Sequence, residues 1–187
     1  PELNITKIPE EEIQNETTKI IKKNFENPQC DFWNIIEKEL IDVEKRYRSK
    51  IIDFETKWKQ RSNLDIFKII EDSKQIEFNK NRARVLIIMK EKWNKYASDE
   101  FHKSISNGES ENIALEKLKS LFLKKEKEFF EILENIKGTT KNNKTWISNE
   151  EFKVIKRDLQ AMIEKDKSDV RIKFTSIKKS RKFKNQI

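Results

Sequence analysis

Glycine and proline are almost absent from this chain: its 187 residues contain two glycines and three prolines. Average usage is about 7% for glycine and about 5% for proline. Because hairpins and the frequent turns of sheet proteins depend on these residues, the shortage disfavours all-β and α/β folds. The sequence therefore predicts an all-α fold, since long helices need few turns.

The longest regular helix is predicted over residues 31–59, with Asp31 as its N-cap. Its apolar residues recur every three or four positions, which is the period of an α-helix. They are Trp33, Ile36, Leu40, Val43, Tyr47, Ile51, Phe54 and Trp58. A coiled-coil seam has a similar period, but here the rhythm slips at 47–51 and the stripe lasts only about four heptads. We interpret this helix as the spine of an intramolecular bundle.

Residues 64–105 contain no glycine or proline, so they form either one long helix or two shorter ones. Ser62 and Asp65 resemble a capping box at its start. The polar run 79–81 is the expected kink. The apolar run 85–89 has the composition of a strand. No neighbouring segment has the pattern of a partner strand, so we expect a helix turn that is buried on all sides.

Three further helices complete the expected fold. One begins at Pro9, because proline suits the first helical position. Another spans 109–137 between the two glycines. The last begins after Ser148, which forms a capping box with Glu151. The residues from 170 onward fit either a strand or a helix, and we favour a helix that frays into a tail.

The predicted architecture is an elongated antiparallel bundle or hairpin of five to six helices with a basic C-terminal extension. Residues 1–137 form a charge-neutral bundle, 138–147 a polar linker, and 148–187 a basic C-terminal helix and tail. The division follows charge: residues 1–137 hold 27 basic and 27 acidic residues, and residues 138–187 hold 14 basic and 6 acidic ones. The whole net charge of +8 therefore lies after residue 137.

The last 17 residues carry seven cations and no acid. Such a segment is typical of an electrostatic docking site for nucleic acid, an acidic protein or an anionic membrane surface. The alternative is a solvated terminus without a specific partner. The candidate docking residues are Arg171, Lys173, Lys178, Lys179, Arg181, Lys182 and Lys184.

Three aromatic residues are candidate partner contacts because they stand in polar or basic surroundings: Trp146, Phe174 and Phe183. The two phenylalanines, interleaved with cations, suit stacking on unpaired bases or anchoring in lipid headgroups. The alternative for each of the three is packing against the protein itself. The sequence leaves both interpretations open.

The sequence contains no recognisable catalytic motif. One histidine, His102, and one cysteine, Cys30, cannot build a Cys/His metal site. His102 has serines close by, but no orienting acid or oxyanion hole accompanies them. Two isolated glycines cannot form a phosphate-binding loop. We therefore predict a protein that is not an enzyme and needs no cofactor or metal.

These observations predict a non-catalytic structural or assembly subunit of a larger macromolecular complex, docking through helical faces and its basic C-terminal segment. Its partners are other protein subunits, with RNA or an acidic surface at the C-terminal segment. Two alternatives remain: an RNA-binding protein associated with ribosomes or ribonucleoproteins, and a coiled-coil tether or membrane-surface adaptor. Homo-oligomerisation is not favoured, and no apolar run is long enough for a transmembrane segment. The lone cysteine favours an intracellular, reducing compartment, or an organelle such as the mitochondrial matrix after loss of a targeting segment.

Overall fold

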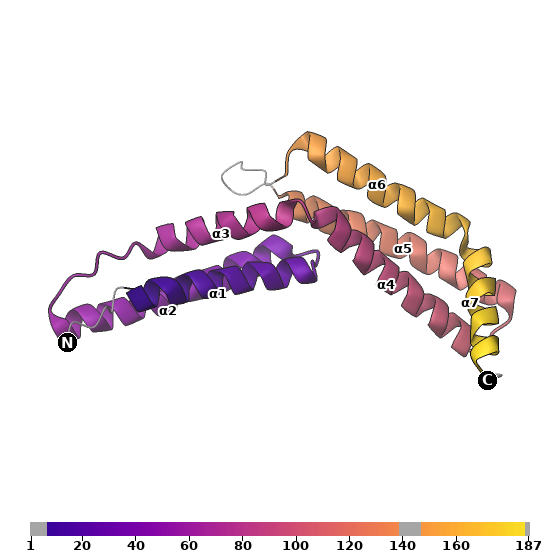
Figure 1. The fold of residues 1–187 in the computed structure, drawn as a ribbon, viewed down its shortest axis with the longest axis horizontal. Coiled ribbons are helices and arrows are strands. Elements are labelled where there is room, and N and C mark those ends of the chain that lie inside the picture. The colour runs from indigo at the N-terminus through magenta and orange to yellow at the C-terminus, as the bar shows by residue number, and fades with distance from the viewer. Residues whose placement is uncertain (1–6, 139–146, 186–187) are drawn as a thin grey trace. The chain divides into compact units, whose positions relative to one another are not determined.

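The computed structural model describes residues 7–138 and 147–185, and every regular element in these ranges is an α-helix (Figure 1). The prediction of an all-α fold is therefore confirmed. The described residues contain seven helices where five or six were expected: α1 (Lys7–Glu26), α2 (Phe32–Trp58), α3 (Ile66–Arg82), α4 (Val85–Ser106), α5 (Glu111–Lys137), α6 (Asn149–Ser168) and α7 (Val170–Asn185).

The helices form two compact units, one built on α1–α3 and the other on α4–α7. The chain first passes between the units at residues 84 and 85. α4 and α5 pack with the C-terminal helices α6 and α7. The division expected from charge, with a neutral bundle over 1–137, a linker over 138–147 and a basic segment over 148–187, stays a prediction.

The first unit is a three-helix arrangement in which each helix contacts the other two and consecutive helices run in opposite directions (Figure 1). An aromatic cluster joins them: Phe25 of α1 meets Phe32 of α2 and Phe78 of α3 edge to face, with ring centroids 5.0 and 5.1 Å apart. Trp33 stacks on Phe78 at 4.9 Å. Edge-to-face and stacked pairs of this kind add about 0.5–1.5 kcal/mol beyond the burial of their area.

The apolar stripe of α2 is buried only as far as Tyr47. At that level the Tyr47 hydroxyl donates towards Glu12 and Glu16, near the start of α1 (3.2 Å each). Few described residues of α1 remain to cover the last turns of α2, so Trp58 is 54% exposed. The intramolecular role predicted for the stripe thus holds for its first half.

Asp31 occupies the N-cap position of α2, but its side chain makes no capping hydrogen bond. At the start of α3, the capping box predicted from Ser62 and Asp65 is wrong. Asp65 itself is the N-cap, and its carboxylate accepts from the backbone N–H of Lys68 (3.2 Å). Ser62 instead accepts from the N–H of Leu64, which is a turn contact before the helix.

Residues 64–105 form two helices, and the break lies at 83–84, after the expected kink at 79–81. The turn is closed by the Arg84 N–H, which donates to the carbonyl of Asn81 (2.9 Å). The run 85–89 is helical, as expected, but it is not buried on all sides, because Ile87 is 54% exposed. Only its first and last residues face the core, which is the spacing of one helical face.

The second unit is built around Trp93 of α4, whose side chain is fully buried. Phe122 and Phe129 of α5 lie against its indole, with centroids 5.6 and 5.4 Å away. α6 packs on α4 and α5, and α7 contacts all three (Figure 1). The start of α6 follows the sequence prediction: Ser148 is the N-cap and its hydroxyl accepts from the N–H of Glu151 (3.1 Å).

Candidate anion-binding surface on α7

The basic C-terminal segment forms a helix from Val170 to Asn185, so the helical interpretation is confirmed over these residues. Two apolar side chains one turn apart hold it to the unit: Val170 is fully buried and Phe174 is 3% exposed. Residues spaced i, i+4 share a helix face, so this pair defines the side of α7 that packs inward. The opposite side faces solvent.

A buried carboxylate fixes α6 and α7 on α4. Asp166, 5% exposed, accepts a hydrogen bond from the Trp93 indole Nε1 (2.7 Å) through one oxygen. Its other oxygen pairs with the Lys173 ammonium of α7. A buried carboxylate needs partners for both oxygens, because an unpaired buried charge is strongly destabilising. We call this three-residue contact the Asp166 anchor.

A second contact ties the far end of α7 to the C-terminal end of α4. The Arg181 guanidinium donates to the carbonyl oxygen of His102 (3.3 Å) and to the Ser106 hydroxyl oxygen (3.0 Å). The C-terminal end of a helix carries partial negative charge, so a cation is stabilising there. Arg181 therefore has a structural role.

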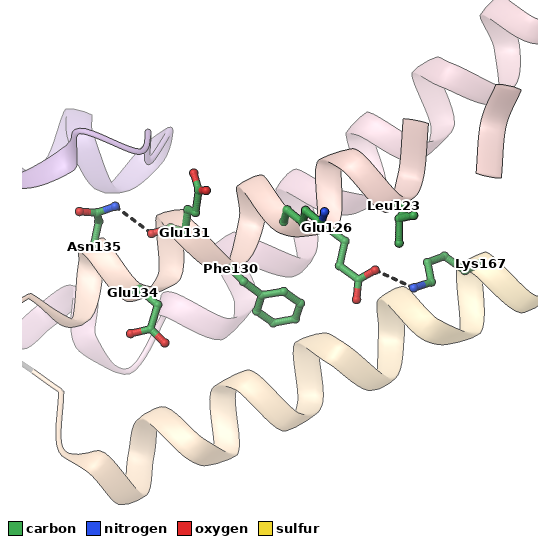
Figure 2. A pocket seen from close by; sticks show the side chains of 8 residues that line it. Leu123, Glu126, Phe130, Glu131, Glu134, Asn135 and Lys167 are labelled. Carbon is green, nitrogen blue, oxygen red and sulfur yellow. Dashed lines mark hydrogen bonds and ion pairs between the residues drawn. The ribbon is translucent and has the colours of Figure 1, made fainter. Parts of the chain in front are cut away.

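α6 is tied to α5 by an ion pair on the rim of a groove (Figure 2). Lys167 donates to Glu126 (2.6 Å) and to Glu164 (2.9 Å), and these hydrogen bonds raise the pKa of Lys167 above its ordinary value. The groove encloses about 670 Å³ and is lined by Leu123, Glu126, Lys127, Phe130, Glu131, Glu134, Asn135 and Lys167. Its lining contains three glutamates and two lysines but no serine, cysteine or histidine.

Five cations of α7 are exposed and form no ion pair with any described residue: Arg171, Lys178, Lys179, Lys182 and Lys184. At about 100° per residue, the first four fall within about 100° of the helix circumference. Lys184 lies on a different side. We call Arg171, Lys178, Lys179 and Lys182 the basic stripe.

The structure thus divides the residues predicted from sequence. Of the seven candidate docking cations, Lys173 and Arg181 are engaged inside the unit, and the other five face solvent. Phe174 is a core residue, which corrects its assignment as a partner contact. Trp146 and the side chain of Phe183 lie outside the part of the chain that the structure describes.

Sequence reasoning missed the Asp166 anchor. The available signal was the short spacing of seven residues between Asp166 and Lys173, which joins an acid near the end of α6 to the first lysine of the basic segment. The indole partner, 73 residues earlier, has no sequence signal, because nothing in a one-dimensional pattern links positions so far apart.

Within residues 7–138 and 147–185, no group of three or more His, Cys, Asp or Glu side chains is placed to hold a metal ion. In the same ranges no helix has the length and apolarity that crossing a membrane requires. Comparison with protein-family models, with curated proteins and with solved structures found no match.

Proposed function

We propose that this protein is a non-catalytic structural subunit of a larger macromolecular complex, which it joins through exposed helical faces and the basic surface of α7. One observation carries the proposal. Four cations are displayed together on a helix that two separate internal contacts hold in place, the Asp166 anchor and Arg181. Cations held on a fixed scaffold lose little conformational entropy when they bind an anionic partner.

The exposed apolar residues support the docking of helical faces. Isolated apolar residues at a surface are ordinary, but here several lie on the outer faces of helices whose inner faces are already packed. They include Phe67 and Ile76 of α3, each 59% exposed, and Ile172 of α7, 70% exposed. Such residues are available to contact neighbouring subunits.

A second candidate function is binding of nucleic acid by the protein on its own, as an RNA-associated protein. The basic stripe favours it, because lysine point charges are suited to sequence-independent contact with phosphates. The two functions differ in what accompanies the protein: stoichiometric protein partners in the first case, and nucleic acid alone in the second.

Native purification of the full chain with light scattering and absorbance at 260 and 280 nm tests both. We expect a particle heavier than the chain, from which the double variant Lys178→Gln/Lys182→Gln dissociates at lower salt than the wild type. The double variant Lys119→Gln/Lys153→Gln removes the same charge from exposed positions on α5 and α6 and is the control. A wild-type chain that is a monomer, with neither protein nor nucleic acid bound, would refute the proposal.

A further inference from the structure

We propose that the basic stripe binds the sugar–phosphate backbone of a nucleic-acid duplex without reading its base sequence. The inference rests on the proposed function and names the partner of the same surface. It is carried by three features of α7: the kind of cation exposed, the packing of the opposite face, and the absence of an exposed aromatic side chain among its described residues.

The exposed cations are suited to phosphate. Three of the four members of the stripe are lysines, and the only arginine is Arg171, because Arg181 is engaged with α4. The planar fork of arginine recognises carboxylate and phosphate groups in a fixed geometry, whereas lysine binds phosphate as a point charge without fixing its orientation. No acidic residue follows Asp169 in the chain, so no carboxylate of α7 itself offsets the charge of the stripe.

One face of α7 packs inside its own unit. The helix is covered by α4, α5 and α6 along the side marked by Val170 and Phe174. It therefore meets a duplex through its outer face, where three of the four members of the stripe are lysines, and lysine contacts to phosphate carry no sequence information.

Single strands and membranes need side chains that the described residues of this face do not supply. Proteins that hold single strands stack bases on exposed aromatic rings, and interfacial helices insert several apolar residues. Phe174 is 3% exposed and is not available for either role. The described outer face of α7 offers one exposed large apolar residue, Ile172. One isoleucine beside four cations favours a hydrated polyanion over lipid.

The length of the stripe matches a rigid polyanion. At about 1.5 Å per residue, Lys178 and Lys182 are about 6 Å apart along the axis, and Arg171 and Lys182 about 17 Å. A DNA duplex carries one charge per about 1.7 Å of its axis, so several phosphates lie within that span. Because the backbone of α7 is already helical, only the side chains of the stripe have to be ordered on binding.

Fluorescence anisotropy with the full chain and a labelled 20-base-pair DNA of mixed sequence tests the proposal. Four phosphate contacts predict that log K falls with log salt with a slope of about −3.6. For Lys178→Gln/Lys182→Gln we expect a slope of about −1.8 and an affinity about 60-fold lower at 0.1 M salt. Changing the base sequence leaves K unchanged. An RNA duplex in a parallel titration shows which of the two backbones is preferred.

Two controls remove charge elsewhere: Lys119→Gln/Lys153→Gln removes the same two charges from other helices, and Lys184→Gln removes one charge from α7 but off the stripe. We expect wild-type binding from both. Tighter binding of a 20-residue oligouridine than of either duplex, or duplex binding that survives Lys178→Gln/Lys182→Gln, would overturn the proposal. Binding to polyglutamate or to phosphatidylserine vesicles without binding to duplexes overturns it as well, while leaving the proposed docking function intact. Failure to bind any of these polyanions, in a chain that purifies without partners, contradicts both.

Discussion

Replacing Asp166 with alanine removes the acceptor on which α4, α6 and α7 converge. The substitution leaves the indole N–H of Trp93 unpaired in a fully buried position. An unsatisfied buried donor costs about 1–3 kcal/mol. The lost contact to Lys173 adds about 0.2–1 kcal/mol, because that side chain is 41% exposed and its charge is screened by water. We expect the second unit to lose about 2–3 kcal/mol.

Native-state hydrogen exchange is the suitable assay, because it reports the opening free energy of α4 and α6 separately from the other unit. Asp166→Asn supplies a sharper comparison. The amide keeps an oxygen that can accept from Trp93 and loses only the charge towards Lys173. We therefore expect Asp166→Asn to cost about 1 kcal/mol, clearly less than Asp166→Ala.

The control is Asp158→Ala on α6, where the carboxylate is 38% exposed and pairs only with Arg157. We expect it to change the opening free energy by less than about 0.5 kcal/mol. If Asp166→Ala cost no more than this control, the buried indole contact would not support the unit. Equal losses for Asp166→Ala and Asp166→Asn would assign the effect to charge and contradict the role of the hydrogen bond.

Burial, as the main cause, raises the pKa of both Tyr47 and Tyr96 to about 12, which keeps the neutral phenol in the folded chain. Ultraviolet titration should therefore show no ionisation of tyrosine near pH 10 in the native protein, and an ionisation step near pH 10 in urea. The contribution of the two neutral phenols to folding stability is present below pH 10 and lost as the pH rises towards 12. A native step near pH 10 would contradict the burial of both hydroxyls. Ser148→Ala should cost about 1 kcal/mol of unfolding free energy and Asp31→Ala only a few tenths, since of these two N-caps only Ser148 makes a side-chain hydrogen bond. Equal costs of the two substitutions in urea titrations would contradict this reasoning. Arg181→Met should speed amide exchange in the last turns of α7 without affecting its first turn, and protection like that of the wild type would remove Arg181 from the contacts that hold the helix.

Local signals predicted most of the helices correctly. The boundaries of the glycine-bounded helix α5 and the capped start of α6 depend on residues within one turn of each boundary. Such boundaries can therefore be predicted from the local sequence. The break at 83–84 contains neither glycine nor proline, and its turn is closed by backbone groups that every residue type except proline carries. No sequence pattern marks such a break, which explains why the expected kink fell too early.

The candidate surface was predictable in place but not in detail. The excess of cations after residue 170 indicated which segment to consider. Which cations are free to bind depends on tertiary contacts: Lys173 faces a buried carboxylate on α6, and Arg181 reaches the end of α4. Charge counting treats all seven as equivalent, whereas packing divides them into structural and exposed groups.

The sequence separation between the residues of the Asp166 anchor also determines how far apart in time they are synthesised. Trp93 and Asp166 are 73 residues apart, and ribosomes add about 5–20 residues per second. The indole therefore emerges about 4–15 s before its acceptor, and α4 and α5 spend that interval with the N–H of Trp93 still hydrated or unpaired. α7 follows only after its partner on α6 exists, so the basic stripe becomes a fixed surface only after Trp93, Asp166 and Lys173 have all been synthesised.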